Sequence, residues 1–160
     1  MRQTRITIAI AAIAVAGFAY GVAAQQKAAP SAAALPKVTV YKTSSCGCCR
    51  LWVDHLKING FDVQAMDVSS ADVRAVSKAA GLKDEGTSCH TAKIGDYTVE
   101  GHVPAADIKR MLKEKPAIAG LAAPGMPMGS PGMEQGNTKE PYDVLAFKKD
   151  GTSTVYAKHK

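Results

Sequence analysis

The chain has 160 residues, with 20 lysine or arginine residues, 14 aspartate or glutamate residues and a formal net charge of +6. The two signs are evenly mixed and no block of basic residues stands out, which argues against a nucleic-acid-binding groove. The length suits a single domain with a real core, and aromatic residues make up only 6% of the chain, so we expect that core to be mostly aliphatic.

The N-terminal segment has the pattern of a secretory signal peptide. Met1 to Arg5 carry two arginines, Ile6 to Val22 form an uncharged apolar run, and Val22-Ala23-Ala24 offers small residues for cleavage. An uncleaved membrane anchor is the alternative. The apolar run is 17 residues long and rich in alanine, at the short end of what crosses a bilayer.

This pattern predicts export to the periplasm and three segments in the chain. We expect a signal peptide over residues 1–24, a flexible linker over 25–36 and one domain over 37–160. Cleavage would remove two arginines and leave a net charge of +4. Contact with a membrane is expected only if the signal segment is not cleaved.

The sequence pattern in the first part of the domain predicts strands and helices in alternation. The apolar and β-branched periodicities favour these elements: a strand at 37–41, a helix that starts at the Cys46–Cys49 cluster and ends at Asn59-Gly60, a parallel strand at 61–68, a helix from Ser69 or Ser70 to Ala80, a hairpin of 91–94 and 97–100, and a helix with Pro104 at its first position that ends near Pro116. Thr43, Ser44 and Ser45 are candidate caps for the first helix. The order β-α-β-α-β-β-α is that of an α/β, thioredoxin-like domain.

The C-terminal part predicts a long loop followed by a hairpin. Residues 116–141 hold five prolines, five glycines and three methionines without periodicity, which predicts a loop of functional character or disorder. Residues 142–147 and 152–157 then form a C-terminal β-hairpin around Gly151.

Cysteine placement is the strongest chemical signal in the chain. Three cysteines, Cys46, Cys48 and Cys49, lie within four residues, whereas a disulfide framework spreads its cysteines over distant loops. A helix start lowers thiol pKa, so thiolates are favoured there both as ligands and as nucleophiles. Thiolates this close need a cation, and Cu(I) prefers thiolate and thioether ligands. Neighbouring sulfurs can also bridge several copper ions.

The fourth cysteine is predicted to join the same site from a distant loop. In a thioredoxin-like order the loop that enters the third strand faces the start of the first helix, and it usually carries a cis-proline. Here that loop, residues 86–91, contains Cys89 and no proline. His90 beside it could add an imidazole ligand, although strand alternation would point it away.

Methionines in the long loop are further candidate ligands. Met126, Met128 and Met133 do not follow a helical spacing, so core packing explains them poorly, and thioethers are soft copper ligands. Among the remaining histidines, His55 reads as a surface residue, and His102 is balanced between a hydrogen bond to the turn and a role in the site.

Several motifs together resemble the CopG-like family of exported, thioredoxin-like copper-resistance proteins, formerly a domain of unknown function. The resemblance covers about residues 37–158 and is carried by these segments: Val40-Tyr41-Lys42, Cys46-Gly47-Cys48-Cys49, Ser88-Cys89-His90-Thr91-Ala92, residues 99–104 and residues 124–134. It implies copper binding at the cysteine cluster and a role in periplasmic copper handling with other copper-handling proteins as partners.

Three functions follow from these residues, and they remain open at this point. The leading one is a periplasmic protein that holds Cu(I), including a polynuclear cluster and Cu(I)/Cu(II) exchange. The second is a thiol–disulfide oxidoreductase with Cys46 as nucleophile and Cys49 as resolving thiol. The third and weakest is a structural zinc site of four sulfurs.

Overall fold

The computed structural model describes residues 35–160, which form one compact unit. The predicted signal peptide and nearly all of the predicted linker lie outside the described residues. The elements are β1 (Val38–Lys42), α1 (Gly47–Ile58), β2 (Val63–Asp67), α2 (Ser70–Ala79), a 3-10 turn η1 (Asp84–Gly86), β3 (His90–Ile94), β4 (Tyr97–Gly101), α3 (Ala105–Glu114), β5 (Gly120–Ala123), β6 (Tyr142–Phe147) and β7 (Ser153–His159). No helix in this part of the chain has both the length and the apolar character needed to cross a membrane.

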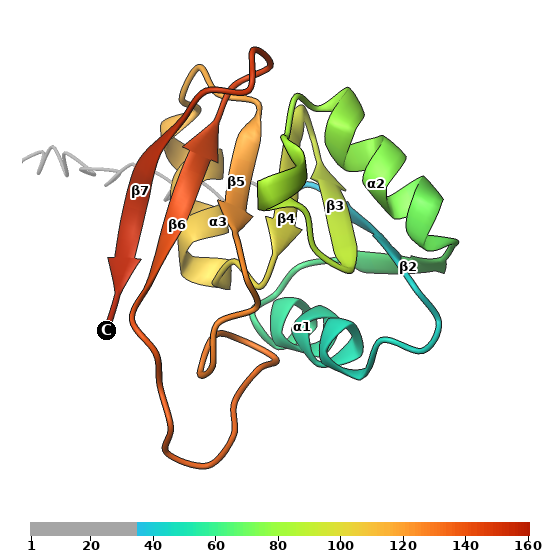
Figure 1. Ribbon diagram of the computed structural model, residues 1–160, viewed down its shortest axis with the longest axis vertical. Helices are drawn as coiled ribbons and strands as arrows, with labels where there is room; N and C mark the ends of the chain where they lie inside the picture. The colour runs from blue at the N-terminus through green and yellow to red at the C-terminus, as the bar shows by residue number, and fades with distance from the viewer. Residues whose placement is uncertain (1–34) are drawn as a thin grey trace, which may run out of the picture. The chain divides into compact units, whose positions relative to one another are not determined.

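All seven strands belong to one mixed sheet, in the order β2-β1-β3-β4-β5-β6-β7 (Figure 1). β1 pairs in parallel with β2 and antiparallel with β3, and β3 pairs antiparallel with β4. The predicted order β-α-β-α-β-β-α and the C-terminal hairpin are therefore confirmed.

The helices cover both faces of the sheet. Trp52 and Leu56 of α1 and Ile108 of α3 belong to one apolar cluster with inward-facing residues of β1, β3 and β4. On the opposite face, α2 contacts β1 and β3, and its Ser77 bonds to Glu100 of β4. Figure 1 shows α2 in front of the sheet and α3 behind it. The core is thus a sheet between two layers of helix, as expected for an α/β domain.

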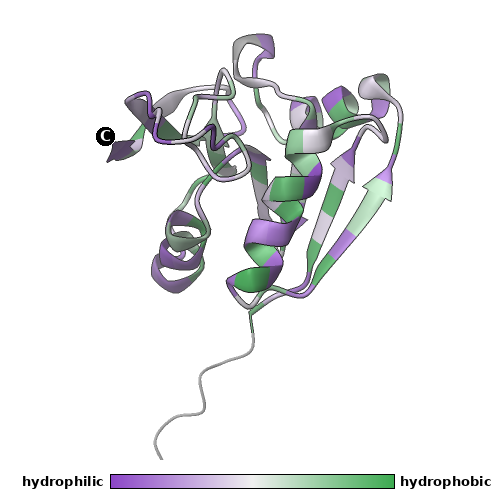
Figure 2. Cartoon of the chain, turned by 90° about the horizontal axis from the view of Figure 1, so that it is seen from below, coloured by the Kyte–Doolittle hydropathy of each residue, from purple (hydrophilic) through white to green (hydrophobic). Residues whose placement is uncertain are grey.

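Helix α1 forms where the periodicity predicts it. Its buried positions are Cys49, Trp52, Val53 and Leu56, which repeat at i, i+3, i+4 and i+7. Figure 2 shows hydrophobic and hydrophilic residues following one another along this helix. Asn59 caps the C-terminal end, and Gly60 continues with φ +86°, a conformation that glycine adopts without strain.

The predicted start of α2 is confirmed, and the predicted start of α3 is shifted by one residue. Ser69 caps α2 in a capping box with Asp72, as expected. Pro104 is the N-cap of α3 with extended backbone (φ −60°, ψ 141°), so the prediction that it occupies the first helical position is wrong by one residue. The cap position suits a proline equally, because no helical hydrogen bond is required of its nitrogen.

The interpretation of residues 116–141 as one loop is wrong over a short stretch. Residues 120–123 form β5, which pairs in parallel with β4 and antiparallel with β6, and all four residues are buried. A Cβ on Gly120 would overlap the carbonyl oxygen of Thr98, so this strand requires the close backbone approach that glycine allows. Small residues without alternation give no local strand signal, and only long-range pairing selects the strand.

Candidate metal centre

Two chain segments that are far apart in sequence meet where β1 ends and β3 begins. β1 ends at Lys42, whose partner in the antiparallel register with β3 is His90, the first residue of β3. The chain that leaves β1 enters α1 at Cys46, and the chain that enters β3 does so from Cys89. The strand register therefore places Cys89 beside the start of α1.

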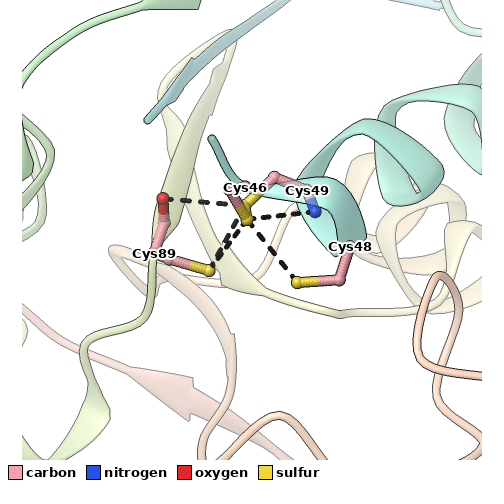
Figure 3. A group of neighbouring side chains, drawn as sticks. All are labelled: Cys46, Cys48, Cys49 and Cys89. Carbon is pink, nitrogen blue, oxygen red and sulfur yellow. Dashed lines mark hydrogen bonds between the residues drawn. A yellow bond between two sulfur atoms is a disulfide. The ribbon is translucent and has the colours of Figure 1, made fainter. Parts of the chain in front are cut away.

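The sulfurs of all four cysteines gather at this point. Cys46, Cys48, Cys49 and Cys89 have ligand atoms that lie within 4.8 Å of one another. The Sγ of Cys89 is 3.2 Å from that of Cys46 and 3.2 Å from that of Cys49, and Cys46 Sγ is 3.5 Å from Cys48 Sγ. Figure 3 shows three of these side chains coming from the start of α1 and Cys89 reaching them from the opposite loop.

Cys46 and Cys49 are joined as a disulfide, and Cys48 and Cys89 are free thiols. Cys49 is fully buried, while the other three are half-buried. The cluster is therefore partly open to solvent at Cys46, Cys48 and Cys89, where an ion or a partner thiol could approach. Its sulfurs are present in two redox forms, two in a disulfide and two as thiols.

Cys46 is itself the N-cap of α1. Its Sγ accepts a hydrogen bond from the backbone N–H of Cys49 at 3.2 Å, so the expectation that a hydroxyl among Thr43–Ser45 caps this helix is wrong. The sulfur occupies the place that a serine oxygen usually takes, next to the free N–H groups at a helix start. Those dipoles stabilise negative charge on the sulfur when it is a thiolate.

Among the predicted thioether and imidazole ligands, Met126 contacts the cluster. Met126 Sδ is 3.8 Å from Cys89 Sγ, and its side chain is 41% exposed. Met128 and Met133 lie further along the same loop and are half-buried. His90 is fully buried and turned into the core. That these four residues bind metal stays a prediction.

His90 and His102 form a buried aromatic group with Trp52. The His90 ring lies 4.6 Å from Trp52 and 4.9 Å from His102, centroid to centroid. Nε2 of His90 donates to Gly101 O at 3.1 Å and Nδ1 of His102 donates to Pro131 O at 2.8 Å, because a carbonyl oxygen can only accept. The remaining nitrogens, His90 Nδ1 and His102 Nε2, have no partner among the described residues. Burial with one unpartnered nitrogen favours the neutral form of both rings.

Burial controls ionisation throughout the site. Burial and, to a smaller extent, the nearby His102 lower the pKa of His90 to about 3, and burial lowers the pKa of His102. Burial also raises the pKa of Cys89 to about 11, and the nearby Cys48 adds to the rise. Burial thus disfavours charge on His90, His102 and Cys89.

The methionine-containing loop is fixed to α1 at one glycine. A Cβ on Gly132 would lie 2.8 Å from the backbone nitrogen of Trp52 and 2.9 Å from the carbonyl oxygen of Cys48. Pro131 beside it accepts the bond from His102, so the loop is held between helix and core at this point. Figure 1 shows the loop alongside α1. The sequence motif marked this segment, but only the structure identifies its anchor.

Two structural roles were not expected from the sequence. His55, read as a surface residue, is half-buried, and its Nε2 accepts the backbone N–H of Ala105 at 3.1 Å, so it caps α3. Glu100 is fully buried on β4 and bonds to the loop that carries Cys89. The available signal for the role of Glu100 was a charged residue inside a predicted strand. Strand alternation places it on the same face as Thr98 and opposite to Val99.

Comparisons with known proteins agree on one family. Residues 86–133 match the model of a family described as "Protein of unknown function, DUF411". A solved structure, "Copper resistance protein copG- Form 1", is similar with a TM-score of 0.72 and 41% identity over 78% of this chain and 98% of that one. "Copper resistance protein copG- Form 2" is similar with a TM-score of 0.71 and 42% identity over 79% and 99%. Among curated proteins, none matches the chain significantly.

Replacing Gly132 should detach the methionine-containing loop from α1. The new Cβ of Gly132→Ala has no room against Cys48 and Trp52, so we expect faster amide hydrogen exchange over residues 126–134 and about 1–3 kcal/mol of destabilisation. Gly60→Ala is the matched control, since Gly60 has φ +86° against +85° for Gly132 but meets nothing within 4 Å. Equal exchange in the two variants would contradict the anchor.

Acid should destabilise the protein through its buried histidines. The pKa values of His55, His90 and His102 are all lowered by burial, so below pH 6.5 the unfolded chain binds more protons than the folded one. The free energy of unfolding, measured in urea without metal, should therefore fall as pH decreases from 6.5 towards 4. His55→Gln, which retains an acceptor for Ala105 but cannot be protonated, should show a shallower fall. A flat profile in wild type would contradict this assignment.

Proposed function

Because the chain belongs to the CopG family of copper-resistance proteins, we propose that it binds Cu(I) through Cys46, Cys48, Cys49 and Cys89. The observation that carries the proposal is the convergence of four cysteine sulfurs within 4.8 Å, from two segments of the chain. Copper resistance is what the solved relatives are named for. Copper ions are accordingly the proposed cargo of this site.

Ligand chemistry supports copper over harder ions. Four thiolates within 4.8 Å repel one another, and burial already disfavours the ionised form of Cys89, so a tightly bound soft cation supplies the missing charge. The helix start at Cys46 adds a smaller stabilisation of negative charge. More sulfurs converge than one two-coordinate ion needs, which suits a polynuclear copper–thiolate cluster with bridging sulfurs.

We further assign the outer ligands to the loop and the core beneath it. Met126 is the nearest thioether, at 3.8 Å from Cys89, and Met128 and Met133 share its loop. A loop anchored at Gly132 can bring them to an ion that protrudes from the sulfur cluster. His90 offers an unpartnered Nδ1 and would have to rotate out of its contact with Trp52 to bind copper.

The disulfide makes electron exchange part of the proposal. The Cys46–Cys49 bond must gain two electrons and two protons before both residues are thiols that can bind copper. In the reverse direction, the two thiolates can transfer one electron each to two Cu(II) ions and so form the disulfide and two Cu(I) ions. Such exchange would serve copper handling in the periplasm, the compartment that the N-terminal segment predicts.

The same disulfide supports a second candidate, a thiol–disulfide oxidoreductase. Cys46 and Cys49 have the spacing of a redox pair and lie at a helix start, which is what such enzymes use. This function would leave Cys48 and Cys89 without a task, although both approach the pair within 3.5 Å. A closed, redox-silent zinc site fits less well, because the cluster is half-exposed and its own sulfurs form a disulfide.

Metal analysis tests the proposal directly. Mature protein that is purified from copper-fed cells without chelator and kept reduced should contain copper in preference to zinc by elemental mass spectrometry. Cys89→Ser should lower the copper-to-protein ratio while the circular dichroism spectrum stays unchanged, because it removes one ligand and leaves the helices intact. A preparation with stoichiometric zinc and no copper would exclude the copper proposal.

Cys48 separates the two candidate functions. A dithiol exchanger needs Cys46 and Cys49 alone, whereas a cluster loses a bridging ligand when Cys48 is removed. We expect Cys48→Ser to lose most of its copper, and wild type to show little insulin-reductase activity. Strong reductase activity that survives Cys48→Ser would favour the oxidoreductase instead.

A further inference from the structure

Glu100 is a fully buried carboxylate on β4, and both of its oxygens are used. Oε1 accepts the backbone N–H of Ser88, and Oε2 accepts the hydroxyl of Ser77 on α2 at 2.7 Å. Burying a carboxylate in a sheet is costly unless hydrogen bonds compensate it, so its position calls for a reason beyond packing. The two oxygens serve different elements: one holds a loop and the other a helix.

The loop that Glu100 holds is the one that carries Cys89. Ser88 directly precedes Cys89, and its hydroxyl donates to the carbonyl oxygen of His90 at 2.8 Å on the other side. The backbone is thus tied before and after the cysteine. No peptide bond in residues 35–160 is cis, so a cis-proline does not shape this loop.

We propose that Glu100 is a positioning residue of the metal site, which holds the Cys89 sulfur against Cys46 and Cys49 through its hydrogen bond with Ser88. This inference rests on the proposed function, in which Cys89 is a ligand. Glu100 has no hydrogen bond with a sulfur among the described residues, and its negative charge makes the smallest contribution to the raised pKa of Cys89. It acts on the site through the backbone, as residues beyond the ligands do in other metal centres.

A purely structural role predicts a different pattern of effects. If Glu100 served only to join α2 to the sheet, its bond to Ser77 would be the essential one, and losing either partner would weaken the fold without a particular effect on Cys89. Positioning makes the Ser88 bond essential and the Ser77 bond dispensable for the site. Ser77→Ala is therefore the matched control, because it removes one hydrogen bond of the same carboxylate on the helix side.

Copper titration of the reduced protein with a competing Cu(I) chelator tests these expectations. Glu100→Met keeps the length of the side chain but removes the oxygen that accepts from Ser88. We expect it to lower the copper affinity about 10–100-fold. Glu100→Gln should restore most of it, because the amide oxygen still accepts from Ser88 while Ser77 accepts from the amide and donates to Val73 O at 3.2 Å. Ser77→Ala should bind as wild type does. A loss in Ser77→Ala as large as that in Glu100→Met would overturn the proposal.

A double variant adds a readout that lost stability alone would not move. If Glu100 acts through Cys89, Glu100→Met combined with Cys89→Ser should bind copper no more weakly than Cys89→Ser alone. Additive losses would overturn the positioning role. Should Glu100→Met fail to fold by circular dichroism, Ser88→Pro takes its place in both experiments, since it removes the donor of the same hydrogen bond, and Ser88→Ala is its control because it loses only the hydroxyl.

A measurement without copper distinguishes this inference from the proposed function. In a Cys48→Ser/Cys49→Ser background, diamide accepts two electrons and two protons from Cys46 and Cys89, whose sulfurs are 3.2 Å apart, as they form a disulfide. Adding Glu100→Met should slow this cross-link about tenfold or more, because the loop no longer holds Cys89 in reach, and Ser77→Ala should not. If Glu100→Met slows the cross-link while the wild-type protein binds no copper, the result would support positioning and refute copper binding. An unchanged rate would overturn the positioning role whatever metal is bound.

Discussion

Backbone hydrogen bonds between β1 and β3 bring together two segments whose cysteines are 40 or more residues apart in sequence. Register decides the result, because shifting β3 by one residue would turn its side chains to the opposite face and move Cys89 away from α1. On their other sides, β1 pairs with β2 and β3 pairs with β4. The site therefore lies at the ends of two inner strands and not along a free edge of the sheet. Every property of the cluster depends on this register.

The same geometry explains why the cluster needs something from outside itself. A helix start and a half-exposed surface favour charged sulfur at Cys46, whereas burial disfavours it at Cys89. Joining Cys46 to Cys49 removes two of the four potential charges, and a soft cation would neutralise all four. Disulfide formation and binding of a soft cation are thus two ways to relieve one electrostatic problem.

Local sequence patterns were sufficient for elements whose signal lies in adjacent residues. The periodicity of Cys49, Trp52, Val53 and Leu56 predicts α1, and Ser69 with Asp72 predicts the start of α2. The predicted order of strands and helices was enough to place Cys89 beside the start of α1, because that placement follows from topology and not from side-chain detail. Strand β5 was missed, since Gly120 and its small neighbours become a strand only through contact with Thr98.

Residues whose roles depend on distant segments were hard to predict for a related reason. Glu100, Gly132 and His55 act through hydrogen bonds or close contacts with residues at least 12 positions away, which no local pattern encodes. These contacts also connect the site to its surroundings: Gly132 joins the methionine-containing loop to the carbonyl oxygen of Cys48, and Glu100 joins β4 to the residue before Cys89. The surroundings of the cluster, and not the cysteines alone, therefore bear on where its sulfurs lie.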